Sequence, residues 1–405
     1  MIANVKASVA RGRVTVPPSK SVAHRLLINA ALCEGVSTIR HLPPNQDIAA
    51  TVDCLRALGA EINIDGAGNC TVCGIGGKTA TGEPRRLCCR ESGSTLRFLI
   101  PIALLDGVET EFVGSRRLFE RPLTIYSDMC KEKGFLWQTT ERGIRVRGWL
   151  EAGKYRLPGN VSSQFVTGLL LALAEMEGDS SIILTTKPES NSYIDITIST
   201  LAEFGIKVER PSKRVLCIRG GQRRRAVSGL RVEGDESGAA FFGALNALDG
   251  DVSVEGTNPD TLQGDRVWRQ MLAEIAEGEP VLSVADCPDL APILMATGAA
   301  CHGVTLTDTA RLKIKESDRG AAMAAELAKC GAEVLVEDNR IIVRGGGLHA
   351  PTTPIDSHND HRIVMSMAVL LTRLGGSIVG AEAVSKSMPE FFELLSGLGI
   401  DVSLR

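Results

Sequence analysis

The sequence predicts an α/β protein of two domains, each built from three copies of a longer βα unit. Three observations indicate this fold. Short segments rich in valine and isoleucine alternate with helical segments rich in alanine and leucine along all 405 residues. A glycine that ends a helix recurs just before a short strand. Strongly apolar helices recur that begin in loops of small polar residues. The length itself favours more than one hydrophobic core.

The first helix is predicted directly after the proline pair at 17–18, because proline and the residue before it disfavour helical backbone. Ser19 or Ser21 can cap the apolar run that follows. Lys20 and Arg25 then lie on the first turns, beside free backbone N–H groups and the positive end of the helix dipole. This arrangement suits a phosphate or a carboxylate.

A helix end, a glycine and a short strand follow one another at five places. The glycines are Gly59, Gly134, Gly205, Gly331 and Gly399. Successive copies lie roughly 70 residues apart, except for one gap of about twice that length. We expect the missing copy near Gly278, and each glycine to be a C-cap, a position that favours left-handed backbone. Six βα units over two domains give three units per domain.

Each unit also contains a helix that begins in a polar loop of small residues. These loops are residues 19–21, 91–95, 160–164, 235–238, 286–289 and 359–362. Helices that are apolar on nearly all sides are buried. Six such helices could converge on one cleft, and each would bring about half a positive charge there.

Composition argues against several classes of function. The net charge of -3 and the aromatic content of 4% do not favour binding to nucleic acid. The N-terminus has no signal-peptide pattern and no apolar run is long enough to span a bilayer, so we expect a soluble cytoplasmic protein without membrane partners. Eleven cysteines are an odd number and indicate reduced thiols. Cys70 and Cys73 could suggest zinc, but they read as one strand with opposed side chains, and we expect no metal.

Several motifs occur in a fixed order along the chain. They are residues 19–25, 92–97, 120–122, 162–164, 193–195, 288–289, 314–319, 359–362, and Lys386 with 389–391. Each motif alone is weakly specific. Together, over essentially the whole chain, they resemble the 5-enolpyruvylshikimate-3-phosphate synthase family of enolpyruvyl transferases.

The resemblance implies two inside-out α/β barrel-like domains with the active site in the cleft between them. We expect residues 1–14 with 233–405 in one domain and residues 15–232 in the other. The implied reaction transfers the enolpyruvyl group of phosphoenolpyruvate to the 5-hydroxyl of shikimate-3-phosphate, by addition and then elimination of phosphate. It implies small-molecule substrates, no cofactor and a monomer.

The resemblance also implies roles for individual residues. The implied phosphoenolpyruvate contacts are Lys20, Gly93, Arg121, Gln164, Arg319, Arg362 and Lys386. The implied shikimate-3-phosphate contacts are Lys20, Ser21, Arg25, Ser162, Ser163, Gln164, Ser190, Tyr193, Asp289 and Lys315. Arginine forks match the paired oxygens of phosphate and carboxylate. Glu316 is the candidate for the proton at C3, and Lys20 and Asp289 are the candidates at the 5-hydroxyl.

Other interpretations of these residues remain open. The run 315–319 also fits a charged surface helix start with a Glu–Arg pair. His361 fits a structural histidine that orients a neighbour. For Asp235 and Ser237 we favour simple helix capping.

The chain departs from the family pattern at three positions. Glu91 replaces a more usual asparagine, and a carboxylate there repels an anion unless Arg97 or Arg90 pairs with it. Arg311 also replaces asparagine, and Ser94 replaces threonine but keeps a hydroxyl.

Two alternative functions differ from the implied reaction in the molecule that the protein would bind. The first is the enolpyruvyl transferase that acts on UDP-N-acetylglucosamine. It usually carries Lys-Ser-Asn at the first motif, where this chain has Val22, and a loop cysteine that 114–121 lacks. The second is a polyanion-binding module, which the acidic composition disfavours.

Overall fold

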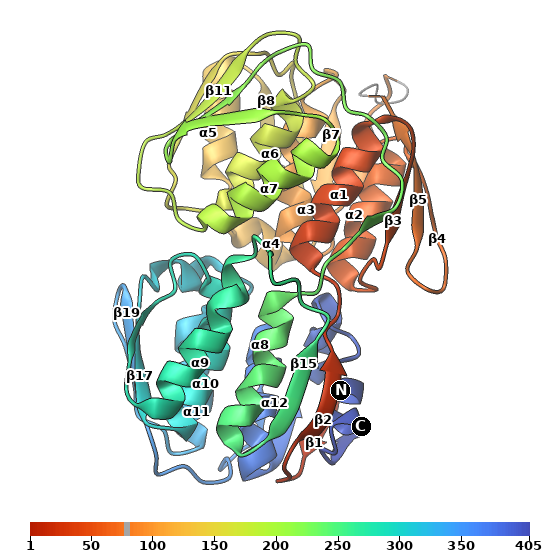
Figure 1. Cartoon of the computed structure of the whole chain (residues 1–405). Helices are drawn as coiled ribbons and strands as arrows, with labels where there is room; N and C mark the ends of the chain where they lie inside the picture. The colour runs from red at the N-terminus through yellow and green to blue at the C-terminus, as the bar shows by residue number, and fades with distance from the viewer. Residues whose placement is uncertain (77–81) are drawn as a thin grey trace. The chain divides into compact units, whose positions relative to one another are not determined.

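The computed structural model describes residues 1–76 and 82–405, and the chain divides into two compact units (Figure 1). Unit 1 contains residues 1–17 and 233–405, and unit 2 contains residues 18–232. Each unit has its own hydrophobic core. No helix within the described residues combines the length and apolar character needed to cross a membrane.

Unit 2 contains three copies of one pattern of strands and helices. The first copy has α1 (Lys20–Leu32), β3 (Glu34–Arg40), α2 (Gln46–Ala57), β4 (Glu61–Ile64), β5 (Cys70–Ile75) and, from the end of the unit, β14 (Leu230–Arg231). The second has β6 (Arg85–Cys88), α3 (Gly93–Ala103), β7 (Thr110–Val113), α4 (Arg116–Glu120), α5 (Thr124–Lys133), β8 (Leu136–Thr140) and β9 (Gly143–Arg147). The third has β10 (Lys154–Leu157), α6 (Ser163–Leu173), β11 (Ser180–Leu184), α7 (Asn191–Glu203), β12 (Val208–Ser212) and β13 (Val215–Ile218).

Unit 1 repeats the pattern with 3₁₀ helices added. One copy has β2 (Arg11–Thr15), α8 (Glu236–Ala244), η1 (Leu245–Leu248), β15 (Asp251–Glu255), η2 (Gly264–Val267) and α9 (Trp268–Glu277). The next has β16 (Val281–Ser283), η3 (Pro288–Leu290), α10 (Ala291–Ala300), β17 (Gly303–Thr307), η4 (Ala310–Ile314), α11 (Arg319–Lys329), β18 (Val334–Val336) and β19 (Arg340–Arg344). The last has β20 (Ile355–Asp356), α12 (His361–Leu374), β21 (Gly376–Val379), η5 (Ala381–Lys386), α13 (Phe391–Gly397), β22 (Val402–Leu404) and, from the start of the chain, β1 (Ile2–Val5).

The sheets share one topology. In the order β6-β7-β9-β8, the first two strands are parallel and the last two form an antiparallel hairpin. The other four-stranded sheets of the described chain have the same order when β14 and β1 are counted as members of their copies. The six predicted βα units are therefore confirmed, one per sheet.

One of the six copies is incomplete, and this explains the long gap between glycines. Its sheet has only the parallel pair β2 and β15, and α9 is followed directly by the first strand of the next copy. Gly278 has φ -178°, an extended conformation that any residue adopts. The five other glycines have φ between 70° and 108°. Of those five, only Gly134 is itself the C-cap residue, and the other four directly follow it. Gly278 is the C-cap of α9, but the prediction of left-handed backbone there was wrong, because no hairpin follows that helix.

The first helix of each copy is buried. Every described residue of α3 except Ser94 is buried, and so is every residue of α8. Within each unit these helices pack on one another, with the sheets toward the outside (Figure 1). This is the inside-out arrangement that the family resemblance implies. Because these helices are buried along their length, their charged side chains can reach the surface only at the polar helix starts.

The cysteine segment at 70–73 lies in β5, as predicted. Cys70 is buried and Cys73 is exposed, so their side chains point to opposite faces of the sheet.

Candidate functional site

Three helix starts bring the charged residues of unit 1 together. Asp289 lies in η3, which leads into α10. Arg319 is the first residue of α11, and Asp318 caps that helix. Arg362 is the second residue of α12, and the capping carboxylate of Asp360 accepts its backbone N–H at 2.9 Å. These caps fix the direction in which each side chain leaves its helix.

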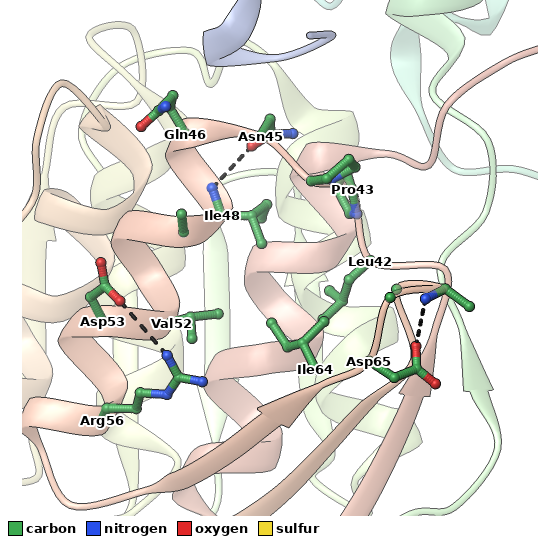
Figure 2. Close-up of a pocket in the computed structure, with 15 residues that line it drawn as sticks. Leu42, Pro43, Asn45, Gln46, Ile48, Val52, Asp53, Arg56, Ile64 and Asp65 are labelled. Atoms are coloured by element: carbon green, nitrogen blue, oxygen red, sulfur yellow. Dashed lines mark hydrogen bonds and ion pairs between the residues drawn. The ribbon is translucent and has the colours of Figure 1, made fainter. Parts of the chain in front are cut away.

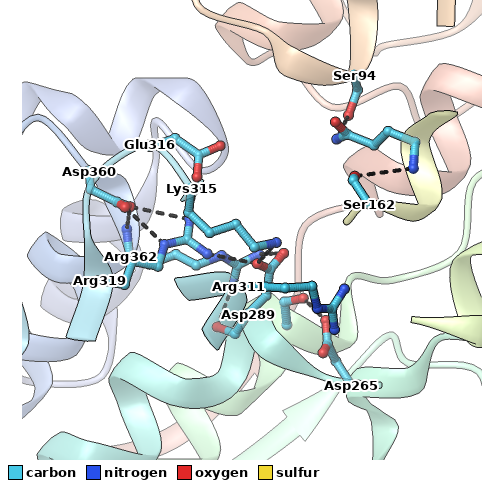
Figure 3. A network of polar contacts seen from close by, with 12 residues as sticks. Ser94, Ser162, Asp265, Asp289, Arg311, Lys315, Glu316, Arg319, Asp360 and Arg362 are labelled. Carbon is cyan, nitrogen blue, oxygen red and sulfur yellow. Dashed lines mark hydrogen bonds and ion pairs between the residues drawn. The ribbon is translucent and has the colours of Figure 1, made fainter. Parts of the chain in front are cut away.

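Arg319 lies at the centre of this cluster (Figure 3). Its Nε donates to Asp360 Oδ2 at 2.9 Å, and its Nη1 donates to Asp289 Oδ1 at 2.7 Å. Its Nη2 donates to Glu316 Oε2 at 2.8 Å. The side chain is only 2% exposed. One buried guanidinium therefore binds three carboxylates, two of which the sequence analysis assigns to proton transfer. The alternative of a solvated surface pair for 315–319 was wrong.

Asp289 connects the same cluster to two further cations. Lys315 Nζ donates to Asp289 Oδ1 at 3.2 Å, and Arg362 Nη2 donates to Asp289 Oδ2 at 3.0 Å. Together with Arg319, three predicted cationic residues meet on one carboxylate. Such charge-assisted hydrogen bonds fix the geometry of both partners.

Burial and charge shift the titration of this cluster. Burial alone would lower the pKa of Arg319, but the charges of Asp360, Glu316 and Asp289 raise it above its usual range. Burial opposes ionisation of Asp360, yet Arg319 and His361 keep the pKa of that carboxyl below its ordinary value. Burial lowers the pKa of the Lys315 ammonium, and Asp289 partly offsets this. Arg319 and Asp360 are therefore a fixed charge pair near neutral pH.

Two more cations of unit 1 are buried. Lys386, at the end of η5, donates to the carbonyl of Asn359 at 2.5 Å. Arg311 donates through Nη2 to the carbonyl of Ala285. His361 lies with its Nδ1 3.7 Å from Asp360 Oδ1, beside the cluster.

Asp265 is a buried carboxyl of unit 1 that the sequence analysis missed. It lies in η2 and accepts a hydrogen bond from the hydroxyl of Ser237. Burial, the nearby charge of Asp289 and, more weakly, that of Asp235 raise its pKa to about 7, while Arg362 and Ser237 act in the opposite direction. Asp235 caps α8 through the backbone N–H of Gly238, as predicted. Asp265 was missed because nothing in the sequence indicates that this single aspartate in a polar turn is buried.

In unit 2, the first motif is arranged largely as expected. Ser19 occupies the N-cap position of α1, without a capping hydrogen bond from its side chain. Lys20 Nζ donates to Asp47 Oδ2 at 2.9 Å. Asp47 lies in the first turn of α2, which Asn45 caps. The sequence analysis missed Asp47, although this helix also begins in a polar loop.

Gly93 allows two arginines to approach the start of α3. A Cβ at this position would lie 2.7 Å from Nη1 of Arg121 and 2.8 Å from Nη1 of Arg97. Arg97 donates to Gln164 Oε1 at 3.0 Å, and Gln164 donates to Ser94 Oγ at 3.0 Å. The predicted residues Gly93, Arg121 and Gln164 therefore lie in one cluster.

Arg25 has a structural environment that the sequence did not indicate. Its Nε donates to Thr197 Oγ1 at 2.8 Å, and its Nη2 donates to Thr167 Oγ1 at 3.2 Å and to the carbonyl of Tyr193 at 3.1 Å. Its Nη1 donates to the carbonyl of Ser21 at 2.6 Å. Burial lowers the pKa of Arg25 to about 10. Arg25 therefore joins α1 to α6 and α7, and its contact with substrate stays a prediction.

The remaining predicted residues of unit 2 lie at two helix starts. Ser162 caps α6 through the backbone N–H of Gln164, and Ser163 is the first residue of that helix. Ser190 is the N-cap residue of α7 and has φ 55°. Tyr193 is half-buried on the first turn of α7. At the Glu91 loop, Arg90 pairs with Asp53 at 2.7 Å.

A separate pocket of about 510 Å³ lies on unit 2 (Figure 2). Apolar side chains of Leu42, Ile48, Val52 and Ile64 line it, with Arg56 at its rim. It contains none of the predicted site residues. An apolar hollow of this size is typical of ligand sites, but it lacks convergent cations, whereas the charged helix starts of unit 1 bring several together at Asp289.

Comparisons with known proteins give one consistent result. The sequence profile of the family described as EPSP synthase (3-phosphoshikimate 1-carboxyvinyltransferase) matches residues 6–395. A Clostridium kluyveri protein named 3-phosphoshikimate 1-carboxyvinyltransferase is 41% identical over 418 residues, covering 96% of each chain. A Clostridium novyi protein of the same name is 38% identical, covering 96% of this chain and 95% of its own. The structure of an EPSP synthase from Acinetobacter baumannii matches with a TM-score of 0.79 and 26% identity, covering 100% of both chains.

The raised pKa of Asp265 predicts a pH-dependent contribution to stability. Between the unfolded value near 4 and the folded value of about 7, the folded state retains a proton that the unfolded state loses. This carboxyl therefore lowers the free energy of unfolding by about 1.4 kcal/mol per pH unit as pH rises through that window. Asp265→Asn, which can still accept from Ser237, should remove this term. Urea unfolding at several pH values tests it, and parallel pH profiles for the two proteins would contradict it.

Proposed function

Because the chain belongs to the EPSP synthase family, we propose that it transfers the enolpyruvyl group of phosphoenolpyruvate to the 5-hydroxyl of shikimate-3-phosphate. The protein is thus a transferase of the shikimate pathway, which leads to the aromatic amino acids. The products are 5-enolpyruvylshikimate-3-phosphate and phosphate. The observation that carries this proposal is the binding of Asp289 and Glu316 by one buried arginine.

We propose that the cations assigned by the family resemblance bind the two anionic substrates. The phosphoenolpyruvate contacts would be Lys20, Gly93, Arg121, Gln164, Arg319, Arg362 and Lys386. The contacts of shikimate-3-phosphate would be Lys20, Ser21, Arg25, Ser162, Ser163, Gln164, Ser190, Tyr193, Asp289 and Lys315. The proximity of Arg121 to Gly93 supports the first grouping, and that of Lys315 to Asp289 supports the second. Guanidinium forks match phosphate and carboxylate oxygens in pairs.

The reaction needs proton transfer at two atoms. In the addition step the 5-oxygen forms a bond to C2, the hydroxyl loses its proton, and C3 gains one. Glu316, a carboxylate paired with Arg319, would first gain a proton from solvent or from the anionic substrate. It would then donate that proton at C3 and take one back from C3 when the C–O bond to phosphate breaks. Asp289 or Lys20 would accept the hydroxyl proton. Lys20 must first be neutral to act as a base, whereas its ammonium form stabilises the departing phosphate.

The pairing of Glu316 with Arg319 supports its role. Arg319 Nη2 holds Glu316 Oε2 by a hydrogen bond, and the side chain of Glu316 is 21% exposed. A carboxyl that is held in place and still partly exposed suits proton transfer at a defined point. No cofactor is required by this chemistry. We also propose that the protein is a monomer and that it is cytoplasmic, the second of which the free thiols of all eleven cysteines support.

The experiment that tests the proposal is a phosphate-release assay. Release should require both shikimate-3-phosphate and phosphoenolpyruvate, and it should persist in the presence of a chelator. UDP-N-acetylglucosamine should not replace shikimate-3-phosphate. Full activity with the nucleotide sugar would favour the related transferase, and loss of activity in the chelator would show that a metal takes part.

Variants at Glu316 and Lys20 separate chemistry from binding. Glu316→Gln keeps an oxygen for Arg319 but cannot deliver the proton, so we expect kcat to fall about 10²–10⁴-fold. Lys20→Met should lower kcat by a similar factor. Binding of shikimate-3-phosphate to Glu316→Gln, measured by calorimetry, should be nearly unchanged.

Glu337→Gln is a matched control for these variants. Glu337 forms an exposed i,i+3 pair with Arg340, at 2.8 Å, with the same spacing as Glu316 and Arg319. Its kcat should equal that of the wild type. If Glu316→Gln retained more than about a tenth of the wild-type kcat, Glu316 would have no part in proton transfer.

A further inference from the structure

The segment 356–360 supplies hydrogen-bond acceptors for two cations of the candidate site. Asp360 binds Arg319, and the carbonyl of Asn359 accepts from Lys386. His358 has φ 48° and Asn359 has φ 52°, a left-handed backbone that is uncommon outside glycine, although asparagine and histidine adopt it more often than most residues. Within the segment, Asp356 Oδ1 accepts the backbone N–H of His358 at 2.7 Å, and Ser357 Oγ accepts that of Asn359 at 3.1 Å. Contacts from outside the segment add to this support.

Glu326 supplies those contacts. Its Oε2 accepts the backbone N–H of Asp356 at 2.9 Å, and its Oε1 lies 2.9 Å from His358 Nε2. Lys329 Nζ donates to the same carboxylate at 2.6 Å and to the carbonyl of Pro354 at 3.1 Å. The Glu326 side chain is only 2% exposed. Buried carboxylates are rare unless paired, and this one is paired with the start and the middle of the segment.

Helix α11 places Glu326 and Arg319 on the same face. Glu326 follows Arg319 by two helical turns, so the two side chains leave the helix in nearly the same direction. Arg319 binds the end of the segment through Asp360, and Glu326 binds its start and middle. One helix face therefore fixes both ends of 356–360, and with them the carbonyl that binds Lys386.

We propose that Glu326 and His358 are positioning residues for the phosphoenolpyruvate site. They act through Lys386 and Arg319 and do not touch substrate. This inference rests on the proposed function, because it assigns Lys386 and Arg319 to that substrate. It makes buried Glu326, two helical turns from Arg319, and the partly exposed His358 part of the binding machinery.

Two variants test the inference. Glu326→Gln removes the charge that pairs with His358 and Lys329. His358→Asn removes the contact with Glu326 but places at 358 a residue that tolerates left-handed backbone, so it should fold normally. For both, we expect KM for phosphoenolpyruvate to rise about tenfold, which corresponds to about 1.4 kcal/mol. KM for shikimate-3-phosphate and kcat should change less than threefold.

A second measurement does not depend on activity. Lys386 should react several-fold faster with an acetylating reagent in both variants, as measured by mass spectrometry of the peptide that contains it. Asp106→Asn is the control, because Asp106 pairs with buried Arg85 at 2.7 Å in unit 2, away from 356–360. It should leave Lys386 reactivity and both KM values at wild-type levels.

The two readouts separate the possible failures. An inactive wild-type protein would contradict the proposed function, whereas Lys386 reactivity would still decide whether Glu326 and His358 position that lysine. Unchanged reactivity in both variants, with KM for phosphoenolpyruvate also unchanged, would overturn the inference. If the only effect were a lower melting temperature, Glu326 would contribute to fold stability and not to the position of Lys386.

Discussion

The candidate site depends on one buried guanidinium. Arg319 binds Asp360, Asp289 and Glu316 at the same time, and these three carboxylates belong to three different segments of the chain. A buried charge of this kind is tolerated only when its partners are complete, because removing one partner of a buried pair costs about 3–5 kcal/mol. The same contacts that compensate the charge also fix the two carboxylates proposed for proton transfer. The same interactions therefore stabilise the buried charge and set the geometry of these carboxylates.

The repeat architecture explains why such a cluster can form. Each unit buries the first helix of every copy, so the start of that helix is the place where a polar side chain can leave the core. Capping residues such as Asp360 and Asp318 then act twice, since they satisfy free N–H groups and set the direction of the next side chain. The incomplete copy at α9 keeps its buried helix α8 and loses only the outer hairpin. This is the pattern expected if the buried helix starts carry the function.

Much of this could be predicted from the sequence, and the reasons for the rest are physical. Helix periodicity and caps are local, so the helix starts and the five left-handed glycines were readable in the chain. The family motifs supplied the cationic residues. Asp47, Asp265 and Glu326 were missed because burial of a lone carboxyl depends on partners distant in sequence. The hydrogen bonds of Arg25 to Thr197 and Thr167 were missed for the same reason, since these acceptors lie on α7 and α6. The extended backbone of Gly278 follows from the absence of a hairpin after α9. No local sequence pattern predicted that absence.

We propose that Arg319 fixes Asp289 and Glu316 through its planar fork and not merely by its charge. Arg319→Lys keeps the charge, but one ammonium cannot reproduce a planar fork that faces three carboxylates. Arg85→Lys is the matched control, because Arg85 is also a buried arginine whose fork binds a carboxylate, Asp106, at 2.7 and 2.8 Å. The most direct measurement is kcat for phosphate release by both variants. We expect a fall of about 10²-fold or more for Arg319→Lys, the size that misplaced catalytic groups cause, and little change for Arg85→Lys. Equal kcat values for the two variants would contradict the claim.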